Sequence, residues 1–323
     1  MQSYLSVPVD NLNERLIARL LESDNPSIRY RTMTEILEWP EDDPQVCAAQ
    51  AAIPSFPPVA KLLAAQKPEG YWAQRDYYIP KHYSTFWVLS LLADLGLTAE
   101  NEHVRRGCEY MFAHQRPDGQ FCRRRRIPRH DAIWETQAEP CTQARIARFL
   151  IQVGYRSDPR TRTAIGWLLV THRQDAMWLC NRPGHGCLRA TLDFLRAAVL
   201  DPLTAVQPAT SLAASAVCDL LLEPNMGRYH VNEAWEVLTY PYFGYSLISA
   251  LGTLARLGHP MDHPKVDAAF KYLLNRRLTD GSWPLDERYP RLPLDFGEPG
   301  QSNEWLTLDA LGVLEIGNRD FYL

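Results

Sequence analysis

Four glycines recur along the chain at a spacing that sets the length of its structural unit. Gly96, Gly154, Gly258 and Gly317 each follow a largely apolar stretch, and they lie 58, 104 and 59 residues apart. The middle interval is close to twice the others, so the spacing indicates a repeating unit of roughly fifty residues. Glycine just past a helix end takes up the left-handed conformation that closes many helices, which gives the spacing a physical cause.

Each unit is predicted to contain two helices, one ending in a turn with glycine and an aromatic residue, the other more apolar and ending in glycine. The first kind is predicted over residues 58–72, 104–121, 161–178 and 267–283. The second kind is predicted over residues 82–96, 141–154, 185–199, 242–258 and 302–317. The chain shows no alternating strand pattern, so we expect an α/α repeat array in which stacked units cover each other's apolar faces.

The second helices are apolar nearly all round, which indicates that each is covered on its outer side and faces a lined cavity on its inner side. This favours a closed ring over an open solenoid. We therefore predict an all-α fold, an α/α toroid of about five to six helix pairs, over residues 55–323. Residues 1–54 are predicted to form a helical extension packed on the toroid. Its helices are expected over residues 10–22, 26–38 and 44–53, with Asp10 capping the first and Pro26, behind Asn25, opening the second.

Charge and composition exclude several classes of protein. The net charge is −4, and a general nucleic-acid binder would need a basic face, so we expect no nucleic-acid partner. No apolar run approaches the length of a membrane span and the N-terminus lacks a signal-peptide pattern, which predicts a cytoplasmic protein without a transmembrane segment, although transient membrane contact stays open. The seven cysteines do not form a secreted disulfide framework, so reduced thiols are expected.

The turns that end the first helices carry a family resemblance. The turns in question are Gln66…Gly70…Trp72, Gln115…Gly119…Phe121 and, without the glutamine, Asp280-Gly281-Ser282-Trp283. They resemble the QW repeats of squalene–hopene cyclases, whose α/α toroid also forms the β subunits of protein prenyltransferases. The resemblance covers residues 55–320 and implies the toroid fold and a hydrophobic, isoprenoid-like substrate. However, the chain lacks the Asp-x-Asp-Asp acid of class II cyclases and the Asp-rich motifs of class I enzymes.

A cluster of metal-ligand residue types lies between the predicted helices of residues 161–178 and 185–199. Cys180, His185 and Cys187 surround a Pro-Gly turn, and Cys141 begins another apolar helix. Helix N-termini stabilise thiolate, the form of cysteine that binds metal, so these four residues are candidate zinc ligands. The resemblance points the same way, because prenyltransferases hold zinc near the mouth of the toroid. Four protein ligands would make the site structural, and three plus water would make it catalytic. Alternatively, the cysteines are small buried side chains and His185 caps the helix.

The predicted second helices also supply candidate substrate contacts. Aromatic candidates for the lining are Trp87, Tyr242, Tyr245 and Trp305. Aromatic faces suit an isoprenoid and stabilise cationic intermediates, although aromatic residues at helical spacing also occur as plain core. Lys81, beside His82, and the loop arginines Arg124 and Arg125 are candidates for holding an anionic head group, with a solvated surface as the alternative for the arginines.

These patterns favour an enzyme related to terpene cyclases and prenyltransferases that acts on a hydrophobic small molecule, with zinc as a candidate cofactor. Candidate catalytic residues are Asp193, Glu139, His82 and Tyr83, the first two as acids. One alternative is a non-catalytic lipid-binding or scaffold toroid with a structural zinc. Another is a prenyltransferase-like subunit that needs a helical protein partner, and a homodimer is also open.

Overall fold

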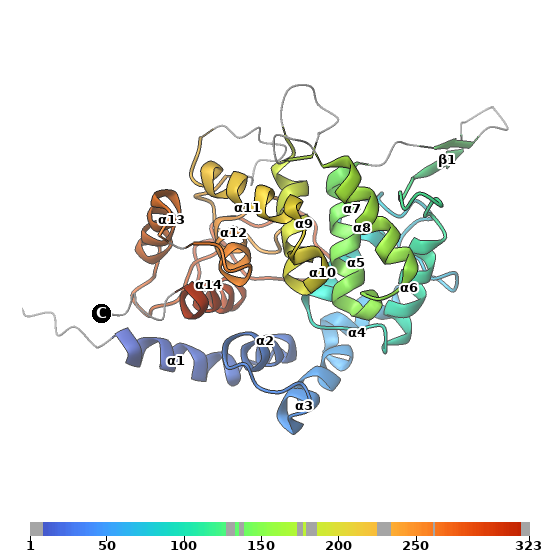
Figure 1. Cartoon of the computed structure of the whole chain (residues 1–323). Helices are drawn as coiled ribbons and strands as arrows, with labels where there is room; N and C mark the ends of the chain where they lie inside the picture. The colour runs from blue at the N-terminus through green and yellow to red at the C-terminus, as the bar shows by residue number, and fades with distance from the viewer. Residues whose placement is uncertain are drawn as a thin grey trace, which may run out of the picture. The chain divides into compact units, whose positions relative to one another are not determined.

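The computed structural model describes residues 9–126, 133–135, 139–172, 177–178, 186–224, 234–260 and 262–317. The chain divides into two compact units, which are described separately (Figure 1). Unit 1 comprises Met1–Ala52, His230–Tyr289 and Phe296–Leu323. Unit 2 comprises Ile53–Tyr229 and Pro290–Asp295. The predicted boundary near residue 54 falls at a break between units, but the N-terminal helices belong to one unit with residues from the C-terminal third.

Unit 2 is built from two layers of helices. The first layer consists of α5 (Thr85–Asp94), α7 (Pro140–Leu150) and α9 (Leu188–Leu200), which pack side by side. The second layer consists of α6 (Glu102–Phe112) on α5, α8 (Pro159–Thr171) on α7 and α11 (Pro208–Leu220) on α9. Shorter elements of the unit are η2 (Ile53–Ser55), α4 (Pro57–Ala64), η3 (Ile151–Tyr155) and α10 (Pro202–Ala205). The first-layer helices are buried along most of their length.

Two short strands interrupt this helical unit. Strand β1 (Arg124–Arg126) pairs antiparallel with β2 (Ile133–Glu135), and Arg125 lies opposite Trp134. The sequence predicted a loop without strands between Phe121 and Cys141, and this strand pair corrects that prediction. A three-residue strand is too short to show the alternation from which strands are predicted.

In unit 1 the N-terminal helices cover the C-terminal one. Its elements are α1 (Val9–Leu21), α2 (Pro26–Arg31), η1 (Thr32–Ile36), α3 (Pro44–Ala52), α12 (Leu247–Arg256), α13 (Pro264–Asn275) and α14 (Glu304–Gly317). Helix α12 packs between α13 and α14, while α1, α2 and η1 pack on α14. Asn25 caps α2 by accepting from the Ser27 N–H, as the sequence indicated, whereas α1 begins at Val9, so Asp10 lies inside the helix.

A tryptophan makes the same contact near the ends of three helices, α4, α8 and α13. In each turn the indole N–H donates to a carbonyl ten residues upstream at 2.8 to 2.9 Å: Trp72 to Leu62, Trp178 to Leu168 and Trp283 to Leu273. The last carbonyls of a helix have no partner within it, so the indole satisfies one of them while its ring is buried.

A glutamine in each of the turns that end in Trp72 and Phe121 links consecutive helices of unit 2. The Gln66 side-chain N–H donates to the carbonyls of Gly70 and His103, the latter at 2.8 Å in the first turn of α6. Gln115 repeats the arrangement in the next helix pair, where its side-chain N–H donates to the Arg160 carbonyl at the start of α8. Each turn therefore holds the start of the next helix of its kind.

The predicted helix ends are confirmed at three glycines. Gly96, Gly154 and Gly258 have φ angles of 94°, 107° and 68°, in the left-handed region that favours glycine. Helix α11 was not predicted, although Gly227-Arg228-Tyr229 follows it in the sequence, because this segment has neither the glutamine nor the tryptophan or phenylalanine that marks the other turns. Among the described residues no single helix is long and apolar enough to cross a membrane, although one bent pair, Pro44–Ser55 with Pro57–Ala64, reaches that length and composition.

Candidate functional site

Two of the four predicted zinc ligands lie together in unit 2. Cys141 is in the first turn of α7, and Cys187 is the N-cap residue of the neighbouring α9. A hydrogen bond from Cys187 is the largest influence on Cys141 and lowers the pKa of its thiol; burial opposes this and the charge of Arg189 assists it. Cys180 and His185 lie outside the described residues. Within the described part of the chain, no group of three or more metal-binding side chains occurs.

Tyr78 borders this cysteine pair. Burial raises the pKa of Tyr78 to about 12, and the neighbouring Cys141 contributes in the same direction. Its ring packs on Phe86 and Trp87 with centroids 5.2 and 5.3 Å away, and its carbonyl accepts the Trp87 indole N–H at 3.0 Å. The predicted acid Glu139 is exposed at the N-cap of α7. The cysteine pair thus lies beside an aromatic wall at the start of α5.

Cations surround Trp87, one of the predicted substrate contacts. The Lys81 ammonium lies 5.6 Å and the Arg145 guanidinium 5.9 Å from the centre of its ring, within the range of cation–π attraction. The His82 ring meets it edge-on at 5.2 Å. The structure therefore brings Lys81, His82 and Trp87 together. Tyr83, in contrast, is 39% exposed and donates its hydroxyl to the Leu292 carbonyl at 3.2 Å.

Asp193, the other predicted acid, lies in the middle of α9 among arginines. Its side chain is 2% exposed, and its carboxylate lies 2.8 Å from Arg145 and 3.5 Å from both Arg148 and Arg196. A carboxylate surrounded by guanidinium groups is held as a counter-ion. This surrounding argues for a positioning role, in which Asp193 fixes the arginines, rather than for proton donation.

The arginines themselves were missed by the sequence analysis. Arg148 reaches across to α5, where it lies 2.5 Å from Asp94 and donates to the Ser90 hydroxyl at 3.0 Å. Arg145 and Arg148 lie on one face of α7, as Asp193 and Arg196 lie on one face of α9. A signal for these arginines was present in the sequence: charged residues recur three positions apart on largely apolar helices.

The loop arginines Arg124 and Arg125 form part of strand β1. Their side chains lie outside the described part of the structure, so their predicted contact with an anionic head group stays a prediction.

Unit 1 holds an aromatic cluster made of Tyr240, Tyr242, Phe296 and Trp305. Tyr240 stacks on Trp305 with centroids 4.9 Å apart and planes 12° apart, and Tyr242 meets Tyr240 edge-on at 5.2 Å. Phe296 meets Trp305 edge-on at 5.6 Å. Two of the predicted substrate contacts, Tyr242 and Trp305, are thus joined by two residues that the sequence analysis did not select. The third, Tyr245, packs on Trp235 instead.

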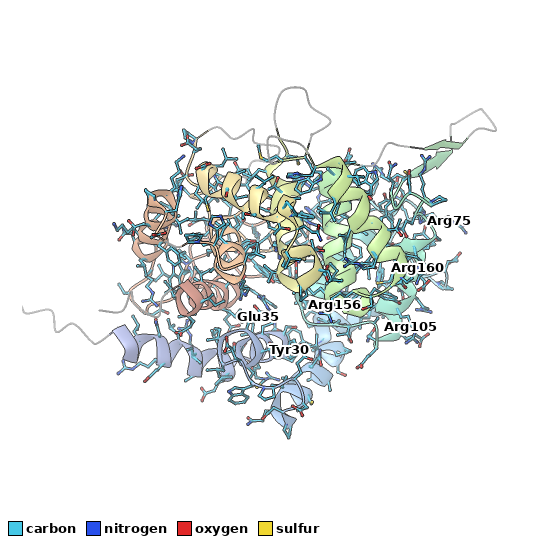
Figure 2. All side chains as sticks on the ribbon, viewed as in Figure 1. Tyr30, Glu35, Arg75, Arg105, Arg156 and Arg160 are labelled. Atoms are coloured by element: carbon cyan, nitrogen blue, oxygen red, sulfur yellow. The ribbon has the colours of Figure 1, made fainter. Side chains whose placement is uncertain are left out.

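A polar network adjoins the aromatic cluster. The buried Tyr242 hydroxyl adjoins Asp309 on α14, and burial, followed by the charge of Asp309, raises the pKa of Tyr242 well above its usual value. Arg31 lies 2.6 Å from both Asp309 and Glu35. Arg256 lies 3.6 Å from Glu35, which Figure 2 labels on η1. The network therefore joins α2, η1, α12 and α14 beside the cluster.

Comparison with known proteins supports the fold and leaves the reaction open. No protein-family profile and no curated protein sequence matches the chain. A solved protein from Actinoplanes matches with 17% sequence identity and a TM-score of 0.50, over 95% of this chain and 99% of that one. At this identity the likeness concerns the fold. With the helix pairs described above, it confirms the predicted class, an all-α fold of the α/α-toroid type.

Two further solved structures have TM-scores below 0.5. One is a variant of the type II terpene cyclase MstE from Scytonema in complex with geranylgeranyl dihydroxybenzoate, with 17% identity, a TM-score of 0.48 and coverage of 95% of this chain and 97% of that one. The other is an inactive variant of an α-1,6-mannanase, GH76A of Salegentibacter, in complex with α-1,6-mannotriose, with 11% identity, a TM-score of 0.47 and coverage of 95% and 98%.

Proposed function

We propose that this chain is a terpene cyclase- or prenyltransferase-like enzyme that binds a hydrophobic, isoprenoid-like substrate against the aromatic cluster of unit 1. The observation that carries the proposal is the stack of Tyr240 on Trp305, with Tyr242 and Phe296 meeting it edge-on. Ring faces attract cations, so aromatic side chains stabilise the positive charge that develops on an isoprenoid chain during cyclisation or transfer.

In this proposal the Tyr242–Asp309 pair is the proton-transfer group in contact with the cluster. A carbocation ends its reaction by losing a proton from a neighbouring carbon. The Tyr242 oxygen would take that proton as its own hydroxyl proton passes to the adjacent Asp309 carboxylate. Arg31, at 2.6 Å, holds the carboxylate in place.

We also propose that Cys141 and Cys187, with Cys180 and His185, bind zinc. The support is chemical: two thiols hydrogen-bonded to each other at the starts of two adjacent helices suit a soft divalent cation, which takes thiolate and imidazole ligands. Four protein ligands would close the coordination sphere, so the metal would serve the structure of unit 2. Elemental analysis of the purified protein and of Cys187→Ala tests this; one zinc per chain, lost in the variant, is expected.

Binding and turnover of a polyprenyl substrate test the enzyme proposal. Purified protein would be titrated with geranylgeranyl diphosphate and with a geranylgeranyl-bearing aromatic acid, and products sought by mass spectrometry. We expect saturable binding that is weakened about tenfold or more in Trp305→Leu, because a buried aromatic contact is lost. Trp167→Leu, on α8 in unit 2, is the matched control.

Three results separate the alternatives. Binding with product formation supports the enzyme, whereas binding without any product supports a lipid carrier or a subunit that lacks its partner. Absence of binding, or equal affinities of Trp305→Leu and the native protein, would remove the aromatic cluster from the proposal.

A further inference from the structure

The N-terminal helices of unit 1 enclose a cavity, called here the N-terminal pocket. Helix α2 packs on both α1 and α3, and the cavity lies among these helices and η1 (Figure 1). Its volume is about 290 Å³, close to the lower end of the range for small-molecule sites. The residues that line it include Leu21, Arg29, Met33, Trp39, Ala48 and Ala49.

The inner wall of the pocket is apolar and buried. Met33 on η1 and Ala49 on α3 are 4% and 5% exposed and belong to one buried cluster. Leu21 and Trp39 pack against this cluster. The chain turns after η1, where Glu38 has a φ angle of 51°, and the Trp39 N–H donates to the Met33 carbonyl at 2.9 Å. This turn places an aromatic side chain on the wall, which therefore favours burial of a hydrocarbon group.

Short side chains on α3 leave the pocket open. Ala48 and Gln45 line it and are exposed, so they form its rim. A larger side chain at position 48 would extend into the space that alanine leaves. A ligand can therefore enter past α3 while the buried cluster stays packed.

Arg29 on α2 is the one charged side chain among the described residues of the lining. One of its terminal nitrogens donates to the Ser23 carbonyl, which fixes the guanidinium in place. Within the described part of the chain Arg29 forms no ion pair. Arg31, two residues later, differs because it lies 2.6 Å from both Glu35 and Asp309. Arg29 therefore retains N–H donors for a ligand.

We propose that the N-terminal pocket binds a small molecule that combines an apolar tail with one carboxylate group, as a medium-chain fatty acid does. The tail lies against Met33 and Trp39, and the carboxylate accepts from the Arg29 guanidinium, whose planar fork of N–H groups matches two carboxylate oxygens. The pocket shares no residue with the aromatic cluster. Its ligand is therefore independent of the enzyme function proposed above.

Calorimetric titration of the full-length protein with octanoate tests the pocket, and 1-octanol serves as an uncharged probe of equal chain length. We expect octanoate to bind with a dissociation constant of about 1 mM or tighter, as the ligand efficiency of small molecules implies. Octanol should bind at least about tenfold more weakly, because it cannot form the charged hydrogen bond.

Filling the pocket should abolish binding. In Ala48→Phe the new ring enters the space from the exposed rim, so the fold is retained and octanoate is excluded. Ala51→Phe is the matched control, because Ala51 is exposed on the same helix and does not line the pocket. This control should bind octanoate like the native protein.

A charge variant separates a ligand-binding arginine from a structural one. Arg29→Met should weaken octanoate binding at least about tenfold and leave octanol binding unchanged, whereas collapse of the pocket would weaken both. The proposal is overturned if the native protein does not bind octanoate or binds octanol equally well. It is also overturned if Ala48→Phe binds octanoate like the native protein, or if Arg29→Met weakens both probes to the same extent.

Discussion

The Arg145 guanidinium lies 2.8 Å from the Asp193 carboxylate, and each of these side chains is 2% exposed. This ion pair joins the middle of α7 to the middle of α9, and Arg148 of α7 also approaches Asp193 at 3.5 Å. Because both partners are out of water, each depends on the other for compensation of its charge.

Removing one partner should therefore be costly. We expect Asp193→Ala to lower the free energy of unfolding by about 3–5 kcal/mol, since it leaves buried guanidinium groups without their shared carboxylate. Urea denaturation measures the change. Asp267→Ala is the control, because its pair with Lys271 is 33% and 67% exposed and should cost at most about 1 kcal/mol. Equal losses in the two variants would contradict the compensation argument.

Replacing glycine by alanine should change the stability of the protein in opposite directions at two positions of unit 2. Gly119 has a φ angle of 94°, and a Cβ atom there would lie 2.4 Å from the Thr163 carbonyl oxygen, so we expect Gly119→Ala to cost about 2 kcal/mol or more. Gly166 lies within α8 with no atom in the way of a Cβ. Gly166→Ala should stabilise the protein by about 0.5–1 kcal/mol through helix propensity. Thermal unfolding of both variants checks the pair, and a gain at Gly119 would refute the close approach.

Stability should fall in alkaline solution partly through Tyr78. Its pKa is raised to about 12 by burial, against 10.0 ordinarily, so the folded state retains this proton when the unfolded state loses it. The contribution is complete below pH 10 and is lost as the pH rises from 10 to 12. In that window Tyr78→Phe should reduce the slope of the unfolding free energy against pH by up to about 1.4 kcal/mol per unit. Denaturation series at pH 8 to 11 measure the slope, and an unchanged slope would show that Tyr78 titrates normally.

The indole bond that closes α4 can be removed without removing the ring. Trp72→Phe loses the 2.8 Å bond to the Leu62 carbonyl, and Phe121 in the corresponding turn shows that phenylalanine fits such a position. We expect a loss of about 1–3 kcal/mol from the unsatisfied carbonyl and the smaller ring. Trp167→Phe, at a partly exposed position on α8, should cost less. Chemical denaturation compares the two.

The sequence was sufficient for most helices because glycine and tryptophan mark their ends. Gly96, Gly154 and Gly258 each stop a helix for a local reason, which a single sequence can reveal. Helix α11 was not predicted because only the weaker Gly227-Arg228-Tyr229 signal, without tryptophan or glutamine, follows it in the sequence. Strands β1 and β2 were not predicted because they are too short to show a pattern.

Less of the candidate sites could be predicted, because they join residues that are far apart in the chain. Tyr242 and Trp305 were selected as parts of predicted helices, although α12 begins only at Leu247 and Tyr242 lies in the loop before it. Tyr240 and Phe296 also come from loops, whose course depends on tertiary packing. Likewise, Asp193 was selected as an acid from its position alone. Its role changes once Arg145 and Arg148, from another helix, are seen to surround it.

The hydrogen bonds of Gln66 and Gln115 can form only after a later helix of unit 2 has been synthesised. Gln66 bonds to a carbonyl 37 residues later and Gln115 to one 45 residues later. On the ribosome each turn therefore waits for the next helix to be made, a delay of about 2–9 seconds at ordinary rates of synthesis. During that interval the newest helix pair is the least secured part of the nascent chain, so its growing end, rather than the finished repeats behind it, is where chaperones would be needed.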